Sequence, residues 1–192
     1  MKNYLIIPAL SCILFINCKE KKGSKNGKVS KEEPPISALS IIKGQLNDLE
    51  KSLYEVRKFE TTGNVTDSSY LKKEEIRNVA APFLSLPEIA DEKYYQKYTE
   101  DKVIDAQQNI LNITSTAKSD TMEIQKQFII IGISPSENSE VQSIYIDRYI
   151  SKGDSTLEQK LYWEIDKSFL IRSIIEKRDQ PEKIHSVKVV WQ

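Results

Sequence analysis

Hydrophobic and polar positions first recur at helical spacing between residues 39 and 53. Apolar side chains follow one another at steps of three and four, which is the stripe of an amphipathic helix. Gly44 lies inside this stripe and costs the helix about 1 kcal/mol relative to alanine, so packing against the rest of the domain has to hold it. The stripe consists of Leu39, Ile42, Leu46, Leu49 and Leu53.

The next segments predict a hairpin and a second helix. Residues 54–59 alternate apolar and polar side chains, Gly63-Asn64 predicts a turn, and residues 65–71 return as a second strand. Residues 88–102 show no clear period. The second helical stripe is Ile76, Val79, Ala80 and Phe83, with Pro82 kinking or ending it.

From about residue 103 the pattern becomes one of strands joined by short turns. Short gaps between β-branched and aromatic runs favour hairpins, so neighbouring strands should be antiparallel. Side chains alternate between faces, and Trp163 therefore lies on the opposite face from Tyr162. Such one-sided strands need a cover, which the two helices can provide. The predicted strands are 103–116, 122–133, 141–151, 156–165, 169–177 and 184–191.

These elements predict an α+β fold. Two N-terminal amphipathic helices pack on a curved, half-barrel-like antiparallel meander, in a single domain over residues 36–192.

The N-terminus has the anatomy of a secretory signal. Lys2 precedes an uncharged, mostly apolar run over residues 4–17, which ends at Cys18. Phe15-Ile16-Asn17-Cys18 resembles the end of a bacterial lipoprotein signal, which lies directly before a lipid-modified cysteine. The resemblance implies a signal peptide over residues 1–17 and a diacylglycerol, usually with a further acyl chain, on Cys18.

Other ways of processing this terminus stay open. Ala9-Leu10-Ser11-Cys12 places a smaller residue at the cut, but cleavage there would leave apolar residues 13–16 on the mature chain. An ordinary signal peptide and an uncleaved anchor are further alternatives. With Cys18 lipidated and Cys12 removed, the folded part has no thiol for a disulfide, a nucleophile or a metal site.

Residues 18–35 read as a flexible tether from the lipidated cysteine to the domain. Low hydrophobicity and like charge keep such a segment solvated. Its lysines also offer attraction to anionic headgroups, as an alternative to a plain spacer. They are Lys19, Lys21, Lys22, Lys25, Lys28 and Lys31.

Composition narrows the functional classes. The chain is 29% charged and 39% hydrophobic with a formal net charge of zero. A general affinity for nucleic acid therefore has no electrostatic support.

Several short segments make residues 54–192 similar to small lipoproteins of the Bacteroidota cell envelope. This resemblance implies a class and a compartment, with an outer-membrane location, but no activity. The segments are Lys72-Lys73-Glu74-Glu75, Ala81-Pro82-Phe83-Leu84, Ile144-Tyr145-Ile146, Gly153-Asp154-Ser155, Leu161-Tyr162-Trp163 and Val189-Val190-Trp191.

Residues with catalytic chemistry are few, and we expect no enzyme, metal or cofactor. His185 is the one histidine and is expected to pack on the face of Val187 and Trp191. A glycosidase-type carboxylate site would have to come from one sheet face, whose charges are explained equally well by solvation. Glycines are isolated, so no phosphate loop exists. The carboxylates in question are Asp147, Glu164 and Glu176, with Arg148 and Arg172 near them in sequence.

Aromatic side chains with a polar tip point to binding. Ordinary packing on a half-buried sheet is the alternative. The candidate binding face consists of Tyr145, Tyr149, Tyr162, Trp163 and Trp191.

Two turns resemble the O-glycosylation acceptor of the same bacterial group, in which an aspartate precedes the modified hydroxyl. The residues concerned are Thr121 and Ser155.

We therefore expect an envelope lipoprotein, anchored to the membrane by lipid, that binds an envelope protein partner as an accessory or assembly subunit. The alternative is a lipid or small-molecule binding module with an apolar cavity between sheet and helices. The two differ in whether Trp163 and Trp191 close onto the helices or line an empty space.

Overall fold

A computed structural model describes residues 34–134 and 138–192. The predictions for Cys18, for the signal segment and for the tether as far as residue 33 lie outside the described residues. All of these described residues belong to one compact unit. Within the described residues, no helix is both long enough and apolar enough to cross a membrane.

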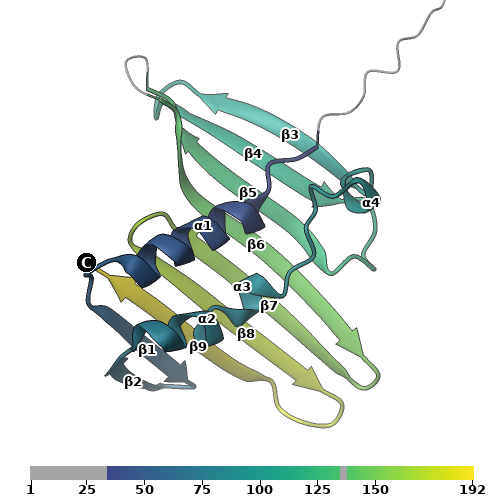
Figure 1. Cartoon of the computed structure of the whole chain (residues 1–192). Coiled ribbons are helices and arrows are strands. Elements are labelled where there is room, and N and C mark those ends of the chain that lie inside the picture. Colours follow the sequence, from purple (N-terminus) through teal and green to yellow (C-terminus); the bar gives the residue numbers. More distant parts are fainter. Residues whose placement is uncertain (1–33, 135–137) are drawn as a thin grey trace, which may run out of the picture. The chain divides into compact units, whose positions relative to one another are not determined.

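The unit is built on one open antiparallel sheet of nine strands, in the order β2-β1-β9-β8-β7-β6-β5-β4-β3 (Figure 1). Each strand from β3 to β9 pairs with the next along the chain, as the short turns predicted. The strands are β1 (Val56–Thr62), β2 (Val65–Tyr70), β3 (Tyr98–Asp105), β4 (Ile110–Ala117), β5 (Ile124–Gly132), β6 (Glu140–Lys152), β7 (Ser155–Glu164), β8 (Ser168–Lys177) and β9 (Lys183–Trp191).

The predicted single strand over residues 103–116 is wrong. It is a hairpin, and its first strand begins earlier, at Tyr98. The turn contains neither glycine nor proline. Instead, Asp105 Oδ1 accepts hydrogen bonds from the backbone N–H groups of Gln107 (2.9 Å) and Gln108 (3.1 Å), and Asn109 takes a positive φ of 52°. A short polar side chain thus closes the turn that glycine would otherwise have marked.

The β1–β2 hairpin joins the sheet beside the last strand of the chain. Val56 of β1 lies opposite Trp191 of β9, and the pairing continues to Thr62 opposite His185. Sequence neighbours alone do not predict this contact, because it joins segments at opposite ends of the domain. It makes β9 an internal strand and leaves β2 and β3 as the two edges of the sheet.

The first predicted helix is α1 (Ala38–Lys51), which lies across one face of the sheet (Figure 1). Ser37 caps it by accepting the backbone N–H of Ser40. Leu53 does not belong to its stripe. The helix ends at Lys51, the backbone of Ser52 is extended, and Leu53 is fully exposed. The stripe that α1 buries is Ala38, Leu39, Ile42, Leu46 and Leu49.

The second amphipathic helix is not formed as predicted. Pro82 has no N–H to donate to the preceding turn, and the helical ladder breaks at Ala80, whose ψ is 2°. Ile76, Ala80 and Phe83 are nevertheless all buried. The segment consists of η1 (Lys73–Glu75), α2 (Ile76–Val79) and α3 (Ala81–Leu84), and a further short helix, α4 (Glu92–Tyr95), precedes β3.

Four aromatic rings fill the space between the helices and the sheet. Trp163 stacks on Phe169 with ring centroids 4.9 Å apart, and Trp191 lies 5.8 Å from Trp163. Phe83 of α3 meets Trp163 edge-on at 5.2 Å. Trp163, Phe169 and Phe83 have no exposed surface. The two tryptophans therefore close onto the helices rather than line an empty space.

A buried arginine fastens α3 to the sheet. The Arg148 side chain is 10% exposed and forms an ion pair with Glu123, with Nε 2.7 Å from the carboxylate. Its Nη1 donates to Ser85 Oγ and to Gln159 Oε1, both at 3.1 Å. One guanidinium thus joins β6, β7 and the end of α3.

Candidate binding face

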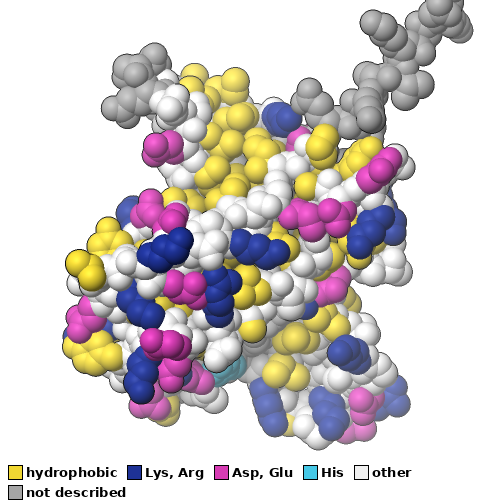
Figure 2. Space-filling model, viewed as in Figure 1, with side chains coloured by type: hydrophobic (Ala, Val, Ile, Leu, Met, Phe, Trp, Pro, Cys, Tyr) yellow, Lys and Arg dark blue, Asp and Glu magenta, His cyan; other side chains and the backbone are white. Residues whose placement is uncertain are grey.

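The helices α1, α2 and α3 all lie on one face of the sheet (Figure 1). Figure 2 shows this helix-bearing side, where acidic and basic side chains are interspersed. The opposite face carries the side chains that alternate with the core residues, and their exposure is intermediate or high rather than buried along most of its length. We call it the uncovered face.

A row of large side chains crosses six strands on the uncovered face. Residues that lie directly opposite on neighbouring antiparallel strands point to the same side, with Cβ atoms about 4.5–5.5 Å apart. Phe128 is paired with Tyr145, and Tyr145 with Tyr162. Tyr162 is paired with Leu170, and the pairing continues to Phe59 of β1. We name the row the aromatic ladder: Phe128, Tyr145, Tyr162, Leu170, Lys188 and Phe59.

The aromatic ladder is only half-buried. Phe128, Tyr145, Tyr162, Leu170 and Phe59 have intermediate exposure, and Lys188 is exposed. The described part of the chain leaves this largely aromatic row partly open to solvent. Such a row is suited to contact with another molecule, and tyrosine is enriched at protein interfaces.

A row of charged side chains runs beside the aromatic ladder on the same face, two residues away along each strand. Lys126 is paired with Asp147, Asp147 with Lys160, and Lys160 with Arg172. Lys160 also contacts Glu158 at 3.3 Å. Lys126, Arg172 and Lys188 have no ion-pair partner among the described residues. The charged row and Lys188 thus hold four cations and one carboxylate, Asp147, while Glu164 lies on the other side of the ladder.

Tyr145 is held in place within the ladder. Its hydroxyl donates to Asp147 Oδ1 at 2.5 Å. Burial, followed by this hydrogen bond, raises the pKa of Tyr145. The phenol therefore stays protonated and is a donor and an apolar ring, not a base, at neutral pH.

A depression of about 860 Å³ adjoins the aromatic ladder at Tyr162. Tyr162 contributes to its wall together with Ile130, Ser143 and Glu164, while Asn109 and Lys167 come from the neighbouring turns. Its lining is mixed in polarity.

The five aromatic residues predicted as one binding face do not form one. Trp163 and Trp191 lie in the core beneath the helices, 0% and 5% exposed. Tyr145 and Tyr162 lie on the uncovered face as direct partners, and Tyr149 lies on the same face, opposite Glu158. The correction follows from the period of two along β7, which separates Tyr162 from Trp163.

Four members of the ladder were missed from the sequence. They come from β5, β8, β9 and β1, and only the pairing register brings them into line with the tyrosines. They are Phe128, Leu170, Lys188 and Phe59. Their alternation within each strand is visible in the sequence. Their relative positions are not, because a shift of one residue would move each to the other face.

His185 lies on the helix face of β9, the face of Val187 and Trp191, as predicted. Its Nε2 is 2.8 Å from Glu60 Oε1, and Lys58 Nζ is 2.8 Å from Glu60 Oε2. The hydrogen bond from Lys58, and then the one with His185, lower the pKa of Glu60. In the described part of the chain, no hydroxyl is hydrogen-bonded to His185 that could complete a nucleophilic relay.

The three carboxylates considered for glycoside chemistry share the uncovered face but do not meet. Asp147 lies opposite Lys160, Glu164 opposite Ser168, and Glu176 opposite Thr156, so each stands in a different cross-strand row. The described residues contain no group of three or more metal-ligating side chains.

The two candidate acceptor hydroxyls lie at turns. Thr121 is exposed between β4 and β5, and its Oγ1 is 2.9 Å from Ser119 Oγ. Ser155 begins β7 and donates to the carbonyl of Lys152 at 3.1 Å.

Comparison of the chain with models of protein families, with curated proteins and with solved structures found no match.

Proposed function

We propose that this chain is a lipid-anchored protein of the bacterial cell envelope that binds another envelope protein through its uncovered face. It acts as a non-enzymatic accessory or assembly subunit. The signal segment, Cys18 and the tether support the anchor, and the resemblance to Bacteroidota lipoproteins supports the outer membrane. The aromatic ladder is the observation that carries the binding role.

The chemistry of the partner follows from the ladder and its surroundings. Half-buried tyrosine and phenylalanine rings favour apolar or aromatic anchors on the partner. Lys126, Arg172 and Lys188 have no ion-pair partner among the described residues, and they favour carboxylates around those anchors. We therefore propose a protein partner with an acidic, partly apolar surface.

An apolar carrier cavity has less support. Half-barrel carriers hold their ligand between the sheet and the helices, and here the rings of Trp163, Phe169 and Phe83 occupy that space. Binding of a lipid or small molecule is therefore an alternative outcome of the test that follows.

The test begins with capture of the native protein from gently solubilised envelopes, followed by mass spectrometry of the protein and lipid fractions. A co-purified protein is then produced separately, and its affinity is measured for the wild-type chain and for variants. Tyr162→Ala removes a ring at the centre of the ladder and is expected to weaken binding by about 30-fold, the loss typical of an interface hot spot. Arg172→Glu should also weaken the affinity for the partner, and the loss should be larger at low salt than at high salt.

Tyr54→Ala is the matched control, because Tyr54 is an exposed tyrosine outside the ladder. Equal loss of affinity in Tyr54→Ala and Tyr162→Ala would remove the support for the ladder. A lipid recovered without a protein partner would favour the carrier role instead. The anchor is checked separately by the intact mass of the native chain and by release of Cys18→Ala from the membrane.

A further inference from the structure

The two edges of the sheet differ in how they are protected against pairing. An exposed edge strand is a template for another strand, and proteins usually protect it with charges, proline or a bulge. Edge β3 carries four charged residues among its eight, namely Glu100, Asp101, Lys102 and Asp105. Edge β2 has the sequence Val-Thr-Asp-Ser-Ser-Tyr, with Asp67 as its one charge and no proline.

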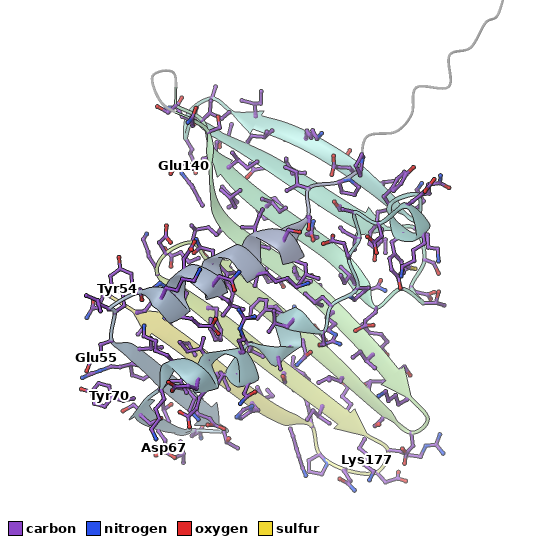
Figure 3. All side chains as sticks on the ribbon, viewed as in Figure 1. Tyr54, Glu55, Asp67, Tyr70, Glu140 and Lys177 are labelled. Carbon is purple, nitrogen blue, oxygen red and sulfur yellow. The ribbon has the colours of Figure 1, made fainter. Side chains whose placement is uncertain are left out.

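No described element covers β2. All six of its residues are exposed, and Figure 3 shows Asp67 and Tyr70 at the margin of the sheet with no strand beyond them. The hairpin itself is well formed, with regular pairing from Arg57 opposite Tyr70 to Thr62 opposite Val65. The pairing of β2 with β1 therefore has no bulge along its length.

The hydrogen bonds of the hairpin decide which backbone groups of β2 are free. The N–H of Leu71 donates to the carbonyl of Val56 at 2.9 Å. The backbone hydrogen bonds of an antiparallel strand alternate between its two sides. The backbone N–H and C=O groups that also point to β1 are therefore those of Ser69, Asp67 and Val65. The backbone N–H and C=O groups of Thr66, Ser68 and Tyr70 consequently point away from the sheet.

We propose that β2 pairs with β2 of a second copy of this chain, antiparallel and centred on Ser68. In this register Ser68 faces its own copy and Thr66 faces Tyr70, so each outward-pointing residue exchanges two hydrogen bonds with its partner. Asp67 faces Ser69, whose hydroxyl can donate to the carboxylate. Hydroxyl and apolar–aromatic contacts of this kind stabilise cross-strand pairs.

Neighbouring registers are worse. Centring the pair on Asp67 sets two carboxylates directly opposite each other, which is destabilising. Centring it on Ser69 carries the overlap past Tyr70, beyond the end of the strand. The self-complementary register on Ser68 uses the whole edge, and it is independent of the proposed partner on the uncovered face.

The first test places a cysteine on the proposed two-fold axis. In the full chain extracted in mild detergent, Ser68→Cys should form an intermolecular disulfide under mild oxidation. The Cα atoms of such a pair lie about 5.5 Å apart, within disulfide range. Thr66→Cys lies on the same strand and face, but its two copies are on the order of 13 Å apart, so it should not cross-link. The wild-type chain, with Cys12 and Cys18, gives the background.

The second test measures the dimer directly by sedimentation. Ser68→Pro removes only an outward N–H, which an edge strand tolerates. It should leave the urea midpoint unchanged and raise the dimer dissociation constant at least about tenfold, while Ser68→Thr leaves that constant unchanged. A wild-type chain that stays monomeric at high micromolar concentration, a dimer indifferent to Ser68→Pro, or equal cross-linking of both cysteine variants would overturn the proposal.

Discussion

Phe83 connects the short helices to the sheet, and its removal tests how firmly they are held. It is the one buried residue of α3. Its ring meets Trp163 edge-on at 5.2 Å and 88°, and Phe169 at 5.6 Å and 76°. We expect Phe83→Ala to be among the most destabilising substitutions in the domain.

The magnitude follows from burial and from the two ring contacts. A fully buried phenylalanine replaced by alanine costs about 3–5 kcal/mol, which includes the cavity that remains. Within that total, each edge-to-face pair accounts for about 0.5–1.5 kcal/mol beyond the buried area. Phe83→Leu fills most of the volume and loses chiefly the ring contacts. We therefore expect losses of about 4 kcal/mol for Phe83→Ala and about 1–2 kcal/mol for Phe83→Leu.

Urea unfolding followed by tryptophan fluorescence is a direct assay. The chain has two tryptophans, and both belong to the cluster that Phe83 contacts or adjoins. The emission spectrum of the native variant also reports whether water enters the cluster. A Phe83→Ala variant within 1 kcal/mol of the wild type, or a Phe83→Leu variant as unstable as Phe83→Ala, would show that α3 is not seated on these rings.

Three further substitutions test other parts of the domain. Gly44→Ala should stabilise the protein by about 0.5–1 kcal/mol in urea unfolding, because the added methyl meets nothing within 4 Å and glycine is a poor helix former. Arg148→Met should lower the free energy of unfolding by about 2–3 kcal/mol through lost hydrogen bonds to Ser85 and Gln159; a loss below 0.5 kcal/mol would contradict its role as a fastener. Because the pKa of Glu60 is lowered in the folded state, its charge stabilises the protein above the usual carboxyl pKa, and this contribution is lost as the pH falls through the folded pKa. Glu60→Gln should therefore flatten the profile of stability against pH below about pH 4.5. The change should be less than about 1 kcal/mol, because the pair is exposed. Urea midpoints measured from pH 7 to 3 test this expectation.

The sequence predicts the late strands well because their turns are short and their alternation is strong. Residues 155–164 and 168–177 form strands close to the predicted limits. It fails where local chemistry substitutes for the usual signal. Asp105 closes a turn that has no glycine, and Pro82 divides a helical stripe into single turns although its apolar residues still pack as the stripe predicts.

The candidate site was only partly predictable, for a reason of geometry. Alternation along β7 separates Tyr162 from Trp163 without any knowledge of the fold. Placing Tyr145 beside Tyr162 requires the β6–β7 register, and placing Phe59 in the same row requires the β1–β9 pairing. A pattern within one strand tells which side chains share a face, whereas a binding surface depends on several strands at once.

The uncovered face and the β2 edge meet at one point, and this gives their two proposals a joint consequence. Ser68 lies opposite Phe59, the last residue of the aromatic ladder. Pairing of two β2 edges at Ser68 would place the ladders of both copies in one continuous row, so that a partner could engage two copies with a gain in avidity. Ser68→Pro should then weaken capture by an immobilised partner without changing the affinity of a single chain. Tyr162→Ala should weaken both the capture and the affinity of a single chain, and should leave the dimer intact. If Ser68→Pro lowered the affinity of the single chain as much as Tyr162→Ala does, the edge would belong to the partner's site, and the two surfaces would not be independent.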